Sequence, residues 1–221
     1  MSAATTRETR EGLVASHVSV TDRTGTVIVD DVSVSARSGR TLVIVGESGA
    51  GKSMLARTLC ALTPSALVAS GAVSLGGETF DLAADQGRLK KQRGGGIVWL
   101  PQDPFTSLAP TLPCGEQISA ARTGRRSERA ERSRELLADV GLDARVARSY
   151  PHELSGGMRQ RVAIAAALDS EPRVLIADEP TTALDVTTQR DILTLLTRLR
   201  DERAMTLVLV THDLALARQF G

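Results

Sequence analysis

The sequence predicts an α/β domain with a mainly parallel, helix-covered sheet, an N-terminal antiparallel β subdomain and an inserted helical subdomain. Short apolar and β-branched runs alternate with helical patterns, which is typical of parallel sheets covered by helices. A hairpin-like pattern comes first, and helical patterns dominate residues 115–168. We therefore expect a flexible tail at residues 1–11 and one domain over residues 12–221, with the helical subdomain inserted at about 103–170.

The first half of the chain supplies the hairpin and the first buried strand. Leu13 to Val20 and Thr26 to Ala36 are rich in β-branched residues and are separated by Gly25, so they predict an antiparallel hairpin. Thr41 to Val45 is a continuous apolar run, which predicts a strand buried in a sheet core. A glycine-rich loop and a helix over about Lys52 to Leu62 follow it.

Further strands are expected at Gly96 to Leu100, Arg173 to Ala177 and Thr206 to Val210, with shorter strand-like pieces between Gly71 and Leu82. Asp185 is placed to cap a helix whose apolar residues recur at helical spacing. The apolar runs are far shorter than the roughly 20 residues that span a bilayer, so we expect any membrane association to come through a partner.

Composition argues against several classes of function. Lysine and arginine total 27 against 26 aspartates and glutamates, so the net charge of +1 offers no broad field for nucleic acid or anionic lipid. We therefore expect no nucleic-acid partner. Cys60 and Cys114 stand in dissimilar contexts, one in a helix and one in a loop, and make no metal or redox pattern. Two unpaired thiols fit a reducing, cytoplasmic compartment.

One loop has the composition of a phosphate cradle. It matches the pattern G-x-x-x-x-G-K-[ST] and reads Gly46, Glu47, Ser48, Gly49, Ala50, Gly51, Lys52, Ser53. Its glycines let the backbone wrap closely enough for successive N–H groups to point at phosphate oxygens. Lys52 would meet the β- and γ-phosphates, and the Ser53 hydroxyl would ligate Mg²⁺. A plain strand-to-helix turn is the alternative, and the flanking strand and helix favour the cradle.

An acidic pair follows the apolar strand that ends at Ala177. In open α/β sheets ligands bind at the carboxyl ends of strands, where Asp178 and Glu179 stand. Asp178 is placed to hold Mg²⁺, and Glu179 to polarise an attacking water as a general base. The alternative is a pair of solvated acids at the start of a loop.

A second glycine-containing helix start reads LSGGMRQR, from Leu154 to Arg161. Free N–H groups at such a start can bind phosphate, although taken alone it is more simply an ordinary helix cap. LSGGMRQR resembles the signature motif of ABC ATPases, and other motifs occur in that family's order. Gln102 resembles the glutamine-loop residue, Ala183-Leu184-Asp185 the loop after the acidic pair, and His212 the switch histidine. The resemblance covers about Leu13 to Phe220.

The resemblance implies a P-loop ABC ATPase in which two subunits sandwich two ATP molecules, as a homodimer or a heterodimer. On it, Ser155, Gly156, Gly157 and Gln160 would serve the nucleotide held by the partner chain. Gln102, placed among the nucleotide-binding and metal-binding residues, would link Mg²⁺ and membrane contacts. His212 would be a catalytic residue that contacts the γ-phosphate. The implied cofactors are ATP and Mg²⁺.

Four stretches resemble the ABC importers of dipeptides, oligopeptides and nickel complexes: Pro101 to Pro110, Gly115 to Ile118, Tyr150 to Leu154 and Asp185 to Gln189. This resemblance implies an ATPase subunit at the cytoplasmic face of the membrane, docked on permease subunits and served indirectly by an extracellular solute-binding protein. A soluble, non-transport ABC ATPase that drives macromolecular remodelling or supports another enzyme complex stays open as the alternative, as does a catalytically idle nucleotide-binding module.

The chain departs from the family pattern in three places. It has no aromatic residue near Val20 and Thr21, where the family stacks one on adenine, and Ala109 stands where asparagine is usual. It also ends soon after His212, where the family continues, so we expect the C-terminal strands to be absent.

Overall fold

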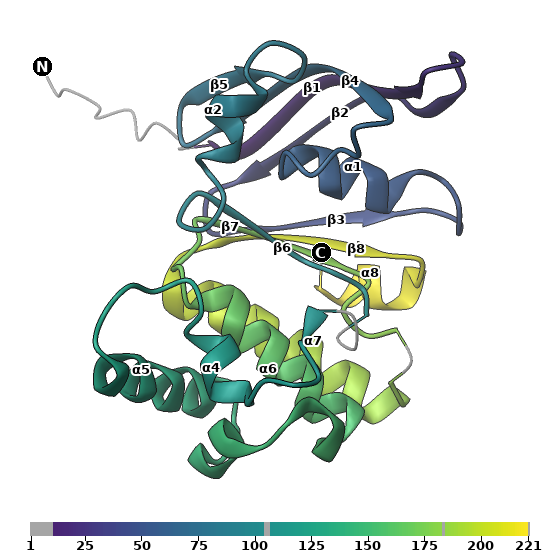
Figure 1. Ribbon diagram of the computed structural model, residues 1–221. Coiled ribbons are helices and arrows are strands. Elements are labelled where there is room, and N and C mark those ends of the chain that lie inside the picture. The colour runs from purple at the N-terminus through teal and green to yellow at the C-terminus, as the bar shows by residue number, and fades with distance from the viewer. Residues whose placement is uncertain (1–10, 104–106, 183, 221) are drawn as a thin grey trace, which may run out of the picture.

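The computed structural model describes residues 11–103, 107–182 and 184–220, which form two sheets and the helices around them (Figure 1). The antiparallel sheet has the order β2-β1-β4-β5 and contains β1 (Glu11–Asp22), β2 (Val27–Arg37), β4 (Leu67–Leu75) and β5 (Glu78–Asp81). The parallel sheet has the order β3-β8-β7-β6 and contains β3 (Thr41–Val45), β6 (Ile97–Leu100), β7 (Val174–Asp178) and β8 (Thr206–Thr211).

The helices lie in separate layers of the molecule. They are α1 (Lys52–Leu59), α2 (Gln86–Lys90), α4 (Cys114–Ile118), α5 (Arg126–Asp139), α6 (Gly156–Leu168), α7 (Val186–Arg203) and α8 (Leu214–Phe220), with short 3₁₀ turns at Ala144–Arg148 and Pro151–Glu153. Figure 1 shows α1 between the two sheets, and α4 to α7 on the far side of the parallel sheet. The order of the layers is therefore antiparallel sheet, α1, parallel sheet, helices.

The side chains of β7 and β8 alternate between the two faces of the parallel sheet, which explains why both faces can be covered. Val174 and Ile176 of β7 join the core that contains α1 and the antiparallel sheet, whereas Leu175 and Ala177 join the core of the helices. Successive side chains of a strand point to opposite faces, so an uninterrupted apolar run supplies both cores. Burial of all five β7 residues follows from this position.

The predicted fold class is confirmed, and the elements lie close to their expected bounds. The predicted hairpin is present as β1 and β2, which pair antiparallel. Of the predicted tail at residues 1–11, Glu11 begins β1, and residues 1–10 lie outside the described residues. The predicted insertion at about 103–170 contains α4, α5 and α6.

Two expectations about local structure are wrong. β3 is not fully buried: all five of its residues are half-buried, because it is the end strand of the parallel sheet and pairs only with β8 among the described strands. Cys114 begins α4 rather than lying in a loop. Both cysteines are free and buried, as unpaired thiols should be, and burial raises the pKa of Cys114 to about 11.

Candidate functional site

The carboxyl ends of all four parallel strands meet at one edge of the sheet. β3 pairs with β8, β8 with β7, and β7 with β6, each in parallel. The phosphate-loop sequence follows β3, and Asp178 ends β7. Gln102 lies two residues after the end of β6, and His212 follows β8 directly. Parallel pairing thus brings residues from four distant parts of the sequence to the place where open α/β sheets bind ligands.

Two glycines of the loop between β3 and α1 have left-handed backbone conformations. The φ angles are 84° at Gly49 and 81° at Gly51, which is the residue that precedes α1. A Cβ built on Gly51 would also collide with the carbonyl oxygen of Ile28 in β2. Glycine is therefore required at Gly51 for both conformation and space.

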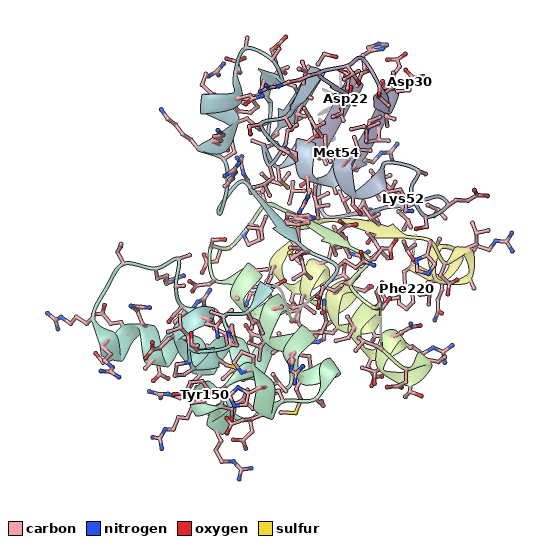
Figure 2. All side chains as sticks on the ribbon, turned by 45° about the vertical axis from the view of Figure 1, so that its right-hand side comes forward. Asp22, Asp30, Lys52, Met54, Tyr150 and Phe220 are labelled. Carbon is pink, nitrogen blue, oxygen red and sulfur yellow. The ribbon has the colours of Figure 1, made fainter. Side chains whose placement is uncertain are left out.

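Lys52 is the first residue of α1 and is 8% exposed. Its place at the start of α1 is labelled in Figure 2. Its Nζ donates hydrogen bonds to the carbonyl oxygens of Gly46, at 2.8 Å, and Glu47, at 2.7 Å. It also lies 3.9 Å from Oε1 of Glu179. The buried ammonium group thus has three oxygen neighbours, two of them in the loop itself.

Asp178 and Ser53 form an oxygen-rich pair beside the loop. Asp178 is 1% exposed, and its Oδ1 accepts a hydrogen bond of 3.0 Å from Oγ of Ser53. Burial raises the pKa of this carboxyl group, and the bond from Ser53 opposes the shift. A carboxylate beside a hydroxyl is a fitting ligand pair for Mg²⁺, which usually takes few protein ligands. Within the described residues, no cluster of three or more His, Cys, Asp and Glu side chains could hold a metal by itself.

The Glu179 side chain faces a different set of partners. Its backbone has a φ of 45°, and its N–H donates to the carbonyl of Val210 in β8 at 2.9 Å. Oε2 accepts from Nε2 of Gln102 at 3.0 Å and from Oγ1 of Thr182 at 3.1 Å, and it lies 3.1 Å from Nδ1 of His212. The structure therefore brings Gln102, Glu179 and His212 together. The carboxylates of Asp178 and Glu179, although adjacent in sequence, contact different partners.

Thr182 is a site residue that the sequence reasoning missed. Its hydroxyl contacts both Glu179 and the side chain of Gln102, the latter at 3.3 Å. Its N–H donates to the Glu179 carbonyl, which closes a tight turn after the acidic pair. The spacing of three residues from Glu179 was the only signal, and threonine is too common in turns for that spacing to be specific.

The second predicted anion site stands apart from the first. Ser155 precedes α6, is exposed, and caps the helix by accepting a hydrogen bond of 3.3 Å from the N–H of Met158. Neither Gly156 nor Gly157 has a positive φ. Between the described residues of this start and those of Gly46 to Ser53, no hydrogen bond or ion pair is formed.

Gln160 departs from its predicted place in the site. It lies on α6 with 1% exposure, and its Nε2 has no hydrogen-bond partner among the described residues. Because this side chain is buried, it cannot contact a nucleotide that is bound to another chain. Ala183 of the predicted loop after the acidic pair lies outside the described residues.

Comparison with known proteins decides the family. A family model described as ABC transporter matches residues 29–182, which is more than half of the chain. The chain belongs to the ABC transporter family. The resemblance inferred from the ordered motifs is thereby confirmed.

The curated relatives of this chain have names that refer to transport. A putative peptide import ATP-binding protein of Brucella melitensis is 44% identical over 207 residues, which is 88% of this chain and 61% of the relative. A dipeptide transport ATP-binding protein of Bacillus subtilis is 42% identical over 212 residues, which is 92% of this chain and 63% of the relative. The chain thus spans somewhat over half the length of the curated relatives that it matches.

Solved ABC structures share the fold. The ATP-binding cassette MJ0796, solved as a dimer in a post-hydrolysis state bound to ADP and Pi, superposes with a TM-score of 0.80 at 32% identity. That match covers 95% of this ABC chain and 91% of the other. The cbiO1 protein of Clostridium perfringens, part of an ABC transporter complex, also has a TM-score of 0.80, at 26% identity over 96% of this chain and 82% of the other. The match to ABC cassettes confirms the predicted core. In the described part of the chain, every helix is too short or too polar to cross a membrane.

Proposed function

We propose that the chain is the ATP-binding and ATP-hydrolysing subunit of an ABC importer, energising uptake of peptides or a related small solute such as nickel complexes. The observation that carries the proposal is the convergence of Lys52, Ser53, Asp178 and Glu179 at one sheet edge. Phosphoryl transfer needs a phosphate cradle, a metal site and a base, and the side chains at this edge fit these three roles. The names of the relatives favour peptide uptake over the remodelling alternative.

The phosphate loop would hold the β- and γ-phosphates of ATP. The N–H groups of Gly46 to Ser53 would donate to phosphate oxygens beside the Lys52 ammonium group, which binds two loop carbonyls at 2.7 and 2.8 Å. On binding, Lys52 would exchange these neutral acceptors for charged phosphate oxygens, which form stronger hydrogen bonds. The positive end of α1 adds a favourable field for the anion.

Ser53 and Asp178, assisted by Gln102, would hold Mg²⁺. Their oxygen donors are of the kind that this ion prefers, and Asp178 is buried without a cationic partner within salt-bridge distance in the described part of the chain. A bound Mg²⁺ would supply positive charge that offsets the negative charge developing on the phosphate oxygens.

Glu179 would act as the general base. Partners on Oε2 fix the carboxylate, while Oε1, which lies 3.9 Å from Nζ of Lys52, would take a proton from the attacking water. Positioned general bases contribute about 10²- to 10⁴-fold to a rate. His212, 3.1 Å from Glu179, would be the second catalytic residue and contact the γ-phosphate.

The α6 start would complete the site of a second ATPase subunit, in a homodimer or a heterodimer. Ser155, Gly156 and Gly157 are the residues we assign to that nucleotide, and we leave the buried Gln160 out of the contact set. A dimeric solved cassette with ADP and Pi supports such an assembly. Permease subunits at the cytoplasmic face of the membrane would be the further partners, and an extracellular solute-binding protein an indirect one.

Replacing Glu179 with glutamine tests the proposal. The amide keeps the shape but removes the base, so phosphate release should fall about 10²- to 10⁴-fold while ATP-dependent dimers persist. Glu202→Gln, on the exposed face of α7, is the matched control and should hydrolyse ATP normally. Undiminished hydrolysis by Glu179→Gln would contradict the assignment, and continued dipeptide uptake by cells that carry this variant in the complete transporter would contradict the transport function.

A further inference from the structure

The starts of α6 and α7 pack directly against each other. A Cβ built on Gly157 would lie 2.8 Å from Cγ2 of Thr188, and one built on Gly156 would lie 3.3 Å from Cδ2 of Leu184. Real Cβ atoms almost never come within 3.0 Å of another heavy atom, so Thr188 fills the space that a side chain at Gly157 would need. Because the φ of Gly157 is not positive, glycine is required there for space and not for conformation.

The γ-methyl group of Thr188 is held in one direction. The Thr188 N–H donates to Oδ1 of Asp185 at 3.0 Å, and its hydroxyl donates to Oδ2 of the same carboxylate at 2.6 Å. These bonds also lower the pKa of Asp185, the hydroxyl bond most of all. A β-branched side chain has little χ1 freedom, and the hydroxyl bond fixes the one rotamer that sends the methyl toward Gly157.

The first turn of α7 is also tied to the loop that follows the acidic pair. Nε2 of Gln189 donates to the carbonyl of Thr181 at 3.2 Å. Thr181 stands next to Thr182, whose hydroxyl contacts Glu179. The methyl of Thr188 therefore has a defined place relative to the hydrolytic carboxylate as well as to α6.

We infer that Thr188 is a positioning residue for the second anion site. Its methyl sets how closely the first turn of α6 approaches α7, and hence where the amides of Ser155 to Gly157 point. Thr188 does not touch nucleotide itself and acts through Gly157. The inference rests on the proposed function, in which those amides bind the nucleotide of a second subunit, and the tests take that subunit to be another copy of the chain.

Two single substitutions separate the methyl from the hydroxyl. Thr188→Ser keeps the cap and removes the methyl, so it should weaken ATP-dependent dimerisation about fivefold or more while ATP binding by the monomer stays unchanged. Thr188→Val replaces the hydroxyl with a second methyl, and in the rotamer preferred by β-branched residues a methyl still faces Gly157, so it should lower the melting temperature and leave dimerisation near that of the parent. Dimerisation is measured by analytical ultracentrifugation in the Glu179→Gln background, and monomer binding with a fluorescent ATP analogue.

A double-mutant cycle tests the contact itself. Gly157→Ala adds the carbon that meets the methyl and should weaken dimerisation. Thr188→Ser removes the obstacle, so the Gly157→Ala/Thr188→Ser variant should dimerise better than the sum of the two single effects predicts. The Gly157→Ala/Thr188→Val variant, which keeps the obstacle, should show no such recovery.

The outcomes distinguish the positioning role of Thr188 from the composite nucleotide site on which it depends. Parent-like dimerisation by Thr188→Ser, or strictly additive effects in the cycle, would overturn the positioning role and leave the proposed function standing. Failure of Glu179→Gln with Thr188 intact to form any ATP-dependent dimer would overturn the composite site, and the positioning role with it.

Discussion

The two glycine-containing helix starts of this molecule need glycine for different physical reasons. At the start of α1, Gly49 and Gly51 adopt left-handed φ angles of 84° and 81°, which residues with a side chain rarely take. At the start of α6, Gly156 and Gly157 have no positive φ, and a Cβ would instead meet the first turn of α7. The two sequence patterns are similar, but glycine is needed at the start of α1 for its backbone conformation and at the start of α6 for its small size.

The two starts also differ in how completely their own chain surrounds them. The first encloses the buried Lys52 and is joined to Asp178 by the bond from Ser53. The second presents the exposed Ser155, whose hydroxyl, within the described residues, bonds only to its own helix. If a nucleotide site is divided between two subunits, each subunit should carry one closed phosphate loop and one exposed helix start. This chain has both.

Gly51→Ala should produce the largest effect, because it combines backbone strain with a collision at the Ile28 carbonyl. We expect loss of ATP binding and a fall of at least about 2 kcal/mol in the free energy of unfolding. Gly49→Ala is the matched control, since its φ is also left-handed but nothing lies within 4 Å of the added carbon; about 1 kcal/mol is expected there. Equal losses for the two variants in chemical denaturation would show that the collision carries no cost.

Asp178→Asn should raise the stability of the folded chain while lowering its ATPase activity. The folded pKa of Asp178 lies above its ordinary value of 3.8, chiefly because of burial. The native state therefore holds this proton more tightly than the unfolded state, and the charged carboxylate costs stability as pH rises above that value. At pH 7 the variant should melt at a higher temperature than the parent in the absence of nucleotide, with phosphate release reduced at least about 100-fold.

Asp22→Asn is the control with the opposite sign. Its carboxylate accepts hydrogen bonds from Thr24 and Thr26, which lower its pKa. That substitution should lower the melting temperature at pH 7, and the effect should disappear as pH falls through the folded pKa. A lower melting temperature for Asp178→Asn at pH 7 would contradict the account of the buried carboxylate.

Patterns that depend on neighbours in the sequence could be predicted from it, whereas those that depend on tertiary contacts could not. The bounds of β3 and the cap at Asp185 follow from local composition, and the structure has both. The half-burial of β3 depends on which strand lies beside it, and the burial of Gln160 on what covers α6. The contact of Thr188 with Gly157 joins two residues that are thirty-one positions apart and lie on different helices, and no local pattern encodes it.

Mixing two inactive variants tests most directly whether the nucleotide site is divided between subunits. Lys52→Ala breaks the closed cradle, and Gly157→Asp places a negative charge at the open helix start. Each variant alone should release almost no phosphate, because both sites of its dimer carry the lesion. In an equal mixture half of the dimers are mixed, and each mixed dimer has one site built from an intact cradle and an intact helix start.

The mixture should therefore recover about a quarter of the parent rate of phosphate release at saturating ATP. If each chain instead carries a complete site of its own, mixing restores nothing. A mixture no more active than the average of its two components would contradict the central claim.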